Sequence, residues 1–312
     1  MTIPVAAGQR ASWAELPAAV HVAVAEVLGD HVVEARSQPG GFSPGSADRV
    51  VTAEGRRAFV KAVGLELNPD SPGIHRREIA VTAALPPEAP APRLLGSYDD
   101  GDWVALVLED VDGRHPEMPW RRDELDRVVR ALADMSHALS PAPPIDVPLL
   151  EEDLATEFTA WDRIAADPPA DLDPWAARHV DRLAELGRAS LPAVRGDTLL
   201  HVDLRADNLL IAAERVVVVD WPWACRGAPW VDLVLFAINP ALYGGHDPDA
   251  LLDRSEILEG VSREEVTSVV AGAAGYFAEA CRRPSVDRMP TVRAFQRAQG
   301  EVCLAWLRRR GI

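Results

Sequence analysis

The stretch "LLHVDLRADNLLI", which runs from residue 199 to residue 211, holds a histidine, an arginine and three carboxylate or carboxamide side chains between apolar residues. The apolar residues favour burial, whereas Asp203, Asp207 and Asn208 need water or partners that replace water. A bound cation or phosphate supplies such partners. The stretch is therefore typical of a ligand site at the edge of a hydrophobic core.

The spacing of another carboxylate, Asp220, from this stretch indicates how the chain folds back. Asn208 lies five residues after Asp203, and twelve residues further on a run of four valines ends at Asp220. This spacing suits a loop followed by a hairpin, which would return Asp220 to the side of Asn208. The pattern H-x-D-L-x-x-x-N, which begins at His201, resembles the kinase catalytic loop. There, the first Asp accepts a hydroxyl proton, and the Asn and a later Asp bind Mg²⁺.

Length and composition limit the class of protein. The 312 residues are 48% apolar and 26% charged, the balance of a globular protein. The chain begins with no basic segment followed by an apolar run, and no apolar stretch approaches the ~18–20 residues of a membrane span. The three cysteines are an odd number without metal or redox spacing. This usage is typical of a reducing compartment, so we expect a cytoplasmic protein.

The formal net charge of −16 bears on the partners. Nucleic-acid binding needs basic patches, and the one run of arginines is Arg308–Arg310, so we expect neither a nucleic acid nor a membrane as partner. The acidity indicates either simple solubility or an electrostatic field that draws in a cationic ligand. Composition alone leaves both open.

Turn signals and hydrophobic periodicity divide the chain into two parts. The first part is expected to hold helix 12–29, strands 31–38, 47–53 and 58–63, helix 71–86, and strands 94–100 and 103–111. The second is expected to hold helices 120–139, 150–166 and 174–191, a buried strand at 215–220, and mostly helix from 230 onward. We therefore expect an α+β fold of two lobes, residues 1–110 and 111–312, with a ligand cleft between them.

Two segments give the chain a family resemblance. "HVDLRADNLL" (201–210) and "VVVDWPWACRGAPWVDL" (217–233) are similar to the catalytic loop and metal-binding segment of the aminoglycoside phosphotransferase and choline kinase-like family. This family consists of small-molecule kinases with a bilobal protein-kinase-like fold. Because the landmarks of the N-lobe come in the same order, the resemblance covers nearly the whole chain. It departs at Val202, where Gly is usual, at Arg205, where His is frequent, and at Trp221-Pro222 in a triplet that usually contains Gly.

The resemblance implies a role for each residue of the motif. Asp203 is the expected catalytic base, and Asn208 and Asp220 are the expected Mg²⁺ ligands, hard oxygen donors of the kind this ion takes. An isolated Asp more often caps a turn or ends a strand, so the assignment rests on the three residues together. His201 is expected to shape the loop by hydrogen bonds. Asp232 is expected to hold the loop backbone, as the family's matching Asp implies.

The N-terminal part carries the expected nucleotide contacts. In the Gly- and Ser-rich turn before the strand of Lys61, Gly41, Ser43 and Ser46 are expected to lie near phosphates. By itself such a turn is more often only a hairpin, and the chain lacks the pattern G-x-x-x-x-G-K-[ST]. Lys61 lies inside an apolar strand, which is explained if it pairs with ATP phosphates and with Glu78 of the next helix. A lysine that extends to water at the sheet edge is the alternative.

The last N-lobe strand ends in "LVLEDVDG" (106–113), and the main chain from Glu109 to Val111 is the expected hinge that binds adenine. Acceptor contacts are expected from the part after Gly113, because the phosphoryl group must meet its hydroxyl beside Asp203.

Eight carboxylates lie in the helical insert of this second part: Glu151, Glu152, Asp153, Glu157, Asp162, Asp167, Asp171 and Asp173. A solvated helix face is the commoner meaning of such a cluster. The alternative is a cationic or neutral, ring-containing acceptor that pairs with the carboxylates and stacks on tryptophans such as Trp161 and Trp175.

The sequence therefore predicts a kinase that uses Mg²⁺ and ATP or GTP to phosphorylate a hydroxyl of an antibiotic-like natural product. A kinase of choline, homoserine, a sugar or a nucleoside is the first alternative, and a nucleotide-binding regulator without catalysis is the second. Lys61, Asp203, Asn208 and Asp220 together argue against the regulator. A kinase of protein substrates is disfavoured, because the segment after Asp220 has no A-P-E-like end.

Overall fold

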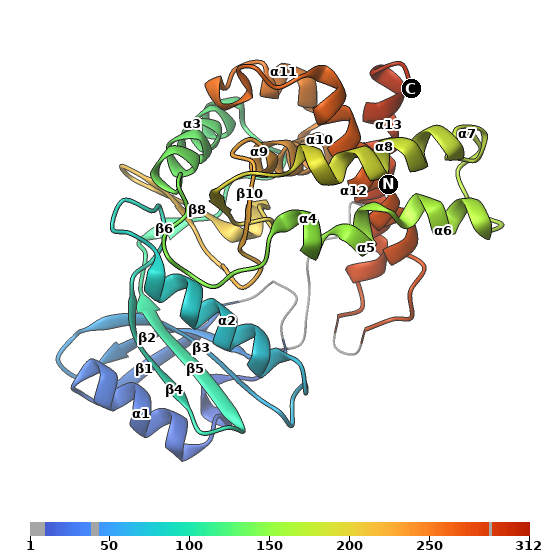
Figure 1. Cartoon of the computed structure of the whole chain (residues 1–312). Coiled ribbons are helices and arrows are strands. Elements are labelled where there is room, and N and C mark those ends of the chain that lie inside the picture. The colour runs from blue at the N-terminus through green and yellow to red at the C-terminus, as the bar shows by residue number, and fades with distance from the viewer. Residues whose placement is uncertain (1–9, 39–43, 287–288) are drawn as a thin grey trace.

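The computed structural model describes residues 10–38, 44–286 and 289–312 and has two lobes (Figure 1). The smaller lobe is built on one antiparallel sheet, and the larger lobe is mostly helical. Buried apolar side chains form two main clusters, one centred in each lobe. The α+β class and the two-lobed arrangement expected from the sequence are thus confirmed.

The sheet of the small lobe has the strand order β1-β2-β3-β5-β4. In chain order the strands are β1 (Val32–Ser37), β2 (Ser46–Thr52), β3 (Arg57–Gly64), β4 (Leu94–Asp99) and β5 (Trp103–Glu109). Successive side chains of a strand point to opposite faces. Val60 and Ala62 of β3 therefore pack with α1 (Ala18–Leu28), whereas Lys61 points to the other face, toward α2 (Ser71–Ala84). The two helices cover opposite faces of the sheet.

The first helix begins later than the sequence predicts. The stretch 12–29 is not one helix, because Trp13–Glu15 form a separate turn of 3₁₀-helix before α1. A capping box forms at the start of this turn, with the Ser12 N–H donating to Glu15 Oε2 at 2.8 Å. Pro17 separates the two helices, since the residue before a proline is driven out of the helical region.

The large lobe is organised around α12. Its helices are α3 (Arg122–Ala138), α4 (Leu150–Asp153), α5 (Ala155–Phe158), α6 (Ala160–Ala166), α7 (Pro174–Arg178), α8 (Val180–Ala193), α9 (Val231–Phe236), α10 (Ile238–Gly244), α11 (Pro248–Leu252), α12 (Arg263–Ala280) and α13 (Val292–Arg309). Since α12 packs against α5, α6, α8 and α13, the helical insert and the C-terminal helix meet on it.

Short strands lie where the two lobes meet (Figure 1). β6 (Gly113–Arg114), β8 (Leu209–Ala212) and β9 (Val216–Val218) form one small sheet, and β7 (Thr198–Leu200) pairs with β10 (Cys225–Gly227). Of these strands the sequence predicted β9 and, as its partner in the expected hairpin, β8. The strands β6, β7 and β10 span two or three residues, which is too few for hydrophobic periodicity to reveal them.

The insert is divided more finely than the two helices predicted over 150–166 and 174–191. α4, α5 and α6 replace the first, with breaks at Leu154 and Thr159, and α7 and α8 replace the second, with a break at His179. The Thr159 hydroxyl donates to the Ala155 carbonyl at 2.6 Å, a local bond that competes with continuation of the helix. Such side-chain competition is invisible to periodicity.

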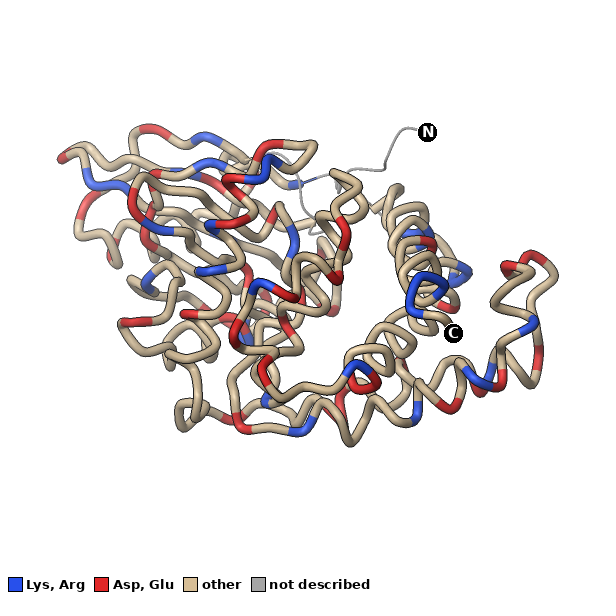
Figure 2. Tube along the Cα trace, turned by 90° about the horizontal axis from the view of Figure 1, so that it is seen from above, with Lys and Arg blue, Asp and Glu red and all other residues tan. Residues whose placement is uncertain are grey.

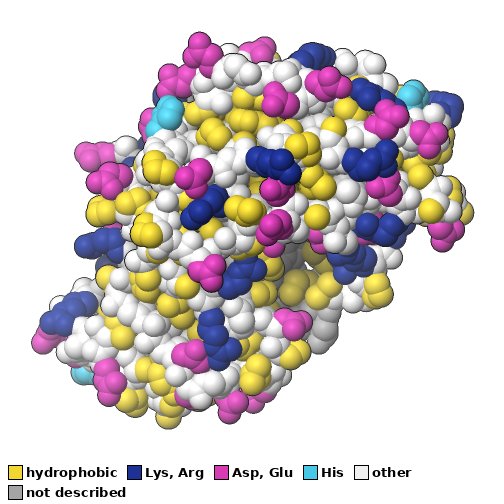
Figure 3. All heavy atoms as spheres, in the orientation of Figure 1, with side chains coloured by type: hydrophobic (Ala, Val, Ile, Leu, Met, Phe, Trp, Pro, Cys, Tyr) yellow, Lys and Arg dark blue, Asp and Glu magenta, His cyan; other side chains and the backbone are white. Residues whose placement is uncertain are grey.

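Charged side chains are spread over both lobes. Acidic and basic residues are mixed along the trace in Figure 2 and interspersed over the face seen in Figure 3. No basic stripe of the kind that follows a phosphate backbone lies on that face. Among the helices of the described ranges, none is long and apolar enough to span a membrane.

Two helical glycines give a matched test of how the insert packs on α12. A Cβ at Gly272 would lie 2.4 Å from Cδ2 of the buried Phe158, whereas a Cβ at Gly73 in α2 would meet nothing within 4 Å. We expect Gly272→Ala to lower the free energy of unfolding by about 1–3 kcal/mol, because an overpacked core must shift. Gly73→Ala should leave it unchanged or raise it by up to about 1 kcal/mol. Urea unfolding measures both, and equal stability of the two variants would contradict this packing.

Candidate active site

The predicted hairpin returns Asp220 to the motif segment. β8 pairs with β9 so that Leu209 lies opposite Val218, and the Val219 N–H donates to the Asn208 carbonyl at 3.0 Å. Asp220 therefore comes directly after a residue whose backbone is bonded to Asn208. The twelve-residue spacing has the structural meaning expected from the sequence.

A buried carboxylate in α9 holds the loop that leads to Asp203. Asp232, which is 4% exposed, accepts the backbone N–H groups of His201 and Val202 at 2.8 Å each. Val202 has a φ of 69°, a left-handed conformation that costs an L-residue about 1–2 kcal/mol. The two charge-assisted hydrogen bonds stabilise this backbone. Asp232 thus contacts the loop in the way the family resemblance implies.

His201 is a structural part of the same loop. Its Nε2 lies 3.0 Å from the Val219 carbonyl oxygen, and its Nδ1 accepts the Asp203 N–H at 3.2 Å. These partners assign the ring proton to Nε2. Burial lowers the pKa of the imidazole below its usual value, which favours the neutral ring. Both ring nitrogens are hydrogen-bonded to backbone groups, as expected for a residue that shapes the loop.

Asp203 is held by side chains on both of its oxygens. Arg205 donates to Asp203 Oδ1 at 2.6 Å and, through Nε and Nη2, to Asp207 at 3.0 Å in each case. Asn208 Nδ2 lies 3.2 Å from Asp203 Oδ2. Burial raises the pKa of Asp203 to about 6, and the charge of Arg205 opposes this rise. The contact of Arg205 with both aspartates was not predicted from the sequence, although its spacing of two residues from an aspartate on each side is a signal.

Asn208 and Asp220 are the oxygen donors that a divalent cation would find here. The Asn208 amide nitrogen donates to the Asp203 carbonyl at 2.8 Å, which leaves its amide oxygen for a cation. The Asp220 side chain is 38% exposed and thus accessible. In the part of the chain that the structure describes, no three His, Cys, Asp or Glu side chains form a cluster that could hold a metal. The two side-chain oxygens of Asn208 and Asp220 nevertheless suit Mg²⁺, because this ion retains bound water molecules and takes further ligands from substrate phosphates.

Lys61 joins the two lobes. Its Nζ lies 2.5 Å from Glu78 Oε2 and 2.7 Å from Asp220 Oδ1, so β3, α2 and the segment after β9 meet at one ammonium group. The Lys61 side chain is 13% exposed and that of Glu78 is 2% exposed. Lys61 is therefore not a lysine that extends to water, and Glu78 is the helix partner that the sequence predicted.

The charges of this cluster perturb one another. Burial alone would lower the pKa of Lys61, but the charges of Asp220 and Glu78 raise it above its usual value. Burial raises the pKa of Glu78 to about 7, with the Lys61 charge opposing the rise. At Asp220 burial also acts to raise the pKa, but Lys61 outweighs it and holds the pKa below its usual range. Asp220 therefore stays ionised, as a metal ligand must.

Two further residues near this cluster were missed by sequence reasoning. His75 of α2 is 3% exposed, and burial together with the Lys61 charge lowers its pKa to about 3, so the ring is neutral. Arg10 is within electrostatic reach of Asp220, whose charge opposes the lowering of its pKa by burial. For His75 the available signal was its position three residues before Glu78, on the same face of the helix.

Part of the predicted phosphate loop lies outside the described residues. This applies to Gly41 and Ser43, which belong to the segment 39–43. A Cβ at Gly45 would lie 2.6 Å from the Ala62 carbonyl oxygen, so a residue without Cβ is needed where the chain enters β2. Ser46 lies in β2 rather than in the turn. Its buried hydroxyl has no hydrogen-bond partner among the described residues.

The predicted hinge lies where β5 leaves the sheet. The Glu109 N–H donates to the Arg93 carbonyl at 2.9 Å, and its carboxylate pairs with Arg215 at 2.9 Å. Val111 is 7% exposed and its carbonyl accepts the Gly113 N–H at 2.9 Å, whereas its own N–H has no acceptor within the described ranges. An unpaired main-chain donor at this place suits a hydrogen bond to a ring nitrogen of adenine.

Comparisons with known proteins agree with this geometry. The sequence model of the phosphotransferase enzyme family matches residues 42–265. A comparison with curated protein sequences finds no significant match.

Solved structures with the same fold cover nearly the whole chain. The chain is similar to a thermostable mutant of the aminoglycoside phosphotransferase APH(4)-Ia, with 15% identity and a TM-score of 0.63 over 94% of this chain and 98% of that one. It is also similar to the choline kinase LicA from Streptococcus pneumoniae, with 14% identity and a TM-score of 0.61 over 92% and 98% of the two chains. A putative fructosamine-3-kinase from Haemophilus somnus has 13% identity and a TM-score of 0.56 over 91% and 96%. At these identities the likeness shows the fold alone, and the expected protein-kinase-like fold is confirmed.

The hold of Asp232 on the loop can be measured by its removal. Asp232→Ala leaves two buried backbone N–H groups without an acceptor, at a cost of about 1–3 kcal/mol each. We expect the free energy of unfolding to fall by about 2–5 kcal/mol. Asp134→Ala, at an exposed position of α3, is the control and should change it by less than about 0.5 kcal/mol. If chemical unfolding gave the two variants the same stability, other contacts would have to hold the loop.

Proposed function

The chain belongs to the phosphotransferase enzyme family and is an ATP-dependent phosphotransferase that acts on hydroxyl groups, and we propose that it inactivates an antibiotic-like natural product by O-phosphorylation. The kinase part of the proposal is carried by one observation. Lys61 Nζ lies 2.5 Å from Glu78 Oε2 and 2.7 Å from Asp220 Oδ1. The β8–β9 hairpin places this Asp220 beside Asn208, which follows Asp203 in the same loop. The acceptor class is supported by the likeness to APH(4)-Ia, whose structure was solved in a ternary complex with AMP-PNP and hygromycin B.

We propose that the nucleotide lies between the sheet of the small lobe and the β8–β9 hairpin. Lys61, held by Glu78, would pair with its phosphates, and the unpaired N–H of Val111 would bind adenine. The full set of proposed nucleotide contacts is Gly41, Ser43, Ser46, Lys61, Glu78, Glu109 and Val111. ATP and GTP are both candidates, since hinge contacts made by the main chain constrain the base little.

The chemistry is proposed to take place at Asp203. Its Oδ2, which is not bonded to Arg205, would accept the proton of the acceptor hydroxyl as the oxygen attacks the γ-phosphoryl group. Asn208 and Asp220 would hold Mg²⁺, which when bound supplies neutralisation of the charge on the transferring phosphoryl group. Arg205 keeps Asp203 in one orientation. Catalysis then consists mostly of positioning and charge neutralisation.

Two of the similar solved structures support a metabolite, rather than an antibiotic, as the alternative acceptor. Because the fold is also that of a choline kinase and a putative fructosamine-3-kinase, a kinase of choline, homoserine, a sugar or a nucleoside is the second candidate. A nucleotide-binding regulator without catalysis would have no use for a base, and the arrangement of Asp203, Asn208 and Asp220 argues against it. We expect acceptor contacts from the large lobe and an acceptor that is cationic or neutral.

One experiment separates these candidates. The protein is incubated with Mg²⁺ and ATP or GTP together with a library of antibiotics and metabolites, and each compound is examined by mass spectrometry for the gain of one phosphate group. Phosphorylation of an antibiotic supports the proposal, and phosphorylation of a metabolite alone supports the second candidate. Nucleotide binding without transfer to any compound would favour the regulator.

Metal-dependent nucleotide binding is expected to stabilise the fold. At a nucleotide concentration 100 times its Kd, mass action adds about 2.7 kcal/mol to the free energy of unfolding, which a thermal shift assay detects as a higher Tm. Asp220→Ala should lose the part of this shift that depends on Mg²⁺, whereas Asp134→Ala should keep it. No shift of the wild-type protein with either nucleotide, with or without Mg²⁺, would rule out the kinase.

Replacement of the proposed base should remove chemistry without removing the fold. Asp203→Asn preserves the size of the side chain, so we expect an unchanged fold and an unchanged nucleotide-dependent rise in Tm. Turnover of a confirmed acceptor should fall by roughly 10²-fold or more, the effect of losing a general base. Steady-state kinetics measure it. Activity within a few-fold of wild type would show that Asp203 is not the base.

A further inference from the structure

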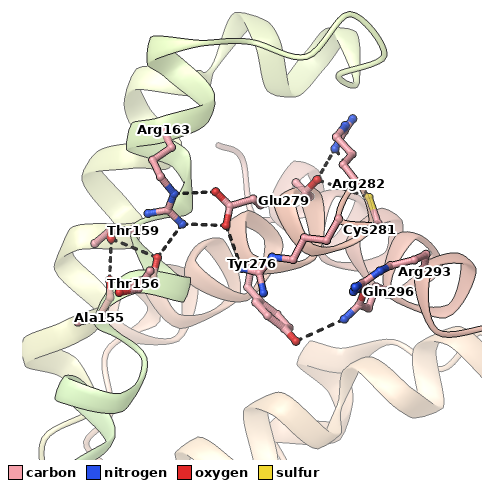
Figure 4. A network of polar contacts seen from close by, with 12 residues as sticks. Ala155, Thr156, Thr159, Arg163, Tyr276, Glu279, Cys281, Arg282, Arg293 and Gln296 are labelled. Carbon is pink, nitrogen blue, oxygen red and sulfur yellow. Dashed lines mark hydrogen bonds and ion pairs between the residues drawn. The ribbon is translucent and has the colours of Figure 1, made fainter. Parts of the chain in front are cut away.

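The loop that bears Asp203 contacts α13, which in turn is bonded to α12. The guanidinium carbon of Arg205, the residue that holds Asp203, lies 5.8 Å from the centre of the Phe295 ring in α13. The next residue of α13, Gln296, donates from Nε2 to the hydroxyl of Tyr276 in α12 at 3.4 Å (Figure 4). A short series of contacts therefore runs from the proposed base to Tyr276.

The Tyr276 hydroxyl is positioned and can still donate. Gln296 is 9% exposed, and its Oε1 accepts from Arg293 Nη1 at 2.9 Å, while Arg293 Nε donates to the Pro284 carbonyl at 2.9 Å. The Gln296 amide is thus oriented with its nitrogen toward Tyr276. Within the described residues the Tyr276 hydroxyl accepts this bond and has no acceptor for its own proton. That proton is available to a ligand.

The charge of Asp203, the proposed base, also affects the pKa of the Tyr276 hydroxyl. Burial raises the pKa of Tyr276 above its usual value, and the charge of Asp203 raises it further, so the phenol remains protonated. Tyr276 therefore presents a neutral donor in the large lobe, within electrostatic reach of Asp203.

The charges around Tyr276 are matched in pairs. Glu279 binds Arg163 at 2.6 Å and Arg283 at 3.1 Å, and Figure 4 shows the first of these pairs beside the tyrosine. Glu157 of α5 is within electrostatic reach of both Tyr276 and Arg163.

In total, three carboxylates pair with three guanidinium groups here: Asp203 and Asp207 with Arg205, and Glu279 with Arg163 and Arg283. An acceptor with several ammonium groups would have to break such pairs and leave guanidinium charges uncompensated, which is costly where the groups are partly buried. A polyanion would meet the same difficulty at the carboxylates.

We propose that Tyr276, positioned by Gln296, binds the acceptor, and that this acceptor is an uncharged ring compound rich in hydroxyl groups. The inference rests on the proposed kinase function and narrows its acceptor class. An oxygen of the ring compound accepts the Tyr276 proton while a neighbouring hydroxyl reaches Asp203. The side chains of α12 and α13 then select the acceptor by hydrogen bonds and shape rather than by charge.

The role of the tyrosine is tested by removing its hydroxyl alone. With the first acceptor identified, Tyr276→Phe is expected to lower kcat/KM for that acceptor by about 3–10-fold, the effect of one lost hydrogen bond. The KM for ATP and the nucleotide-dependent rise in Tm should not change. Tyr98→Phe is the matched control, because Tyr98 donates to Asp100 at 2.8 Å on the surface of the small lobe. Unchanged acceptor kinetics in Tyr276→Phe would overturn the proposal.

The charge of the acceptor is tested with wild-type protein and four probes. Chloramphenicol and myo-inositol are neutral, and hygromycin B and choline are cationic, so each charge class holds one antibiotic and one metabolite. We expect phosphorylation of a neutral probe, with a KM that changes less than about twofold between low and physiological salt, since no exposed charge pair is screened. Phosphorylation of the cationic probes alone, with a KM that rises with salt, would overturn this inference and leave the kinase standing.

The same assay separates a failure of the inference from a failure of the proposed function. If Mg²⁺–ATP raises the Tm but no probe is phosphorylated, the acceptor class inferred here is wrong, whereas nucleotide binding is upheld. If Mg²⁺–ATP neither raises the Tm nor supports transfer, the proposed function itself is wrong and the inference falls with it.

Discussion

The contact of one ammonium group with two carboxylates from different lobes is the interaction on which the rest of the site depends. Glu78 reaches Lys61 from α2, and Asp220 reaches it from the end of the β8–β9 hairpin. Removing three such charges from water is costly, and a buried ion pair is weak support for stability. The value of the contact lies in position: it fixes the sheet that would hold the nucleotide relative to the hairpin that would hold the metal. One carboxylate charge is left over for a cation to neutralise.

Backbone strain is concentrated at the same place. Outside glycine, the described part of the chain has two residues at positive φ, Val202 and Asp220, and they stand on either side of Asn208 in the sequence. A strained backbone persists only where surrounding contacts determine it fully. Asp232 supplies two of these contacts from α9, and the His201 imidazole supplies two more. The hydrophobic core of the large lobe thus positions the motif through a buried carboxylate and a neutral imidazole.

The site was more predictable from the sequence than the details of the fold. The hairpin brings Asp220 to Asn208 and α2 brings Glu78 to Lys61, because spacing along regular elements determines both. The breaks in the insert follow from side-chain competition for backbone groups, which leaves periodicity unchanged. Tyr276 and Gln296 are twenty residues apart on two helices, and no local pattern couples them to Asp203. Such residues become visible only when the helices are packed.

Net charge and local charge lead to different conclusions about the acceptor. A chain with a net charge of −16 and eight carboxylates in its insert suggests attraction of cations. In the structure, however, Glu151, Asp162, Asp171 and Asp173 of that insert each pair with an arginine. Electrostatic recognition depends on the field within about a Debye length of the ligand, and there paired groups largely cancel. The net acidity of the chain is therefore weak evidence for a cationic acceptor, and our proposal assigns the choice of acceptor to hydrogen-bonding groups such as Tyr276.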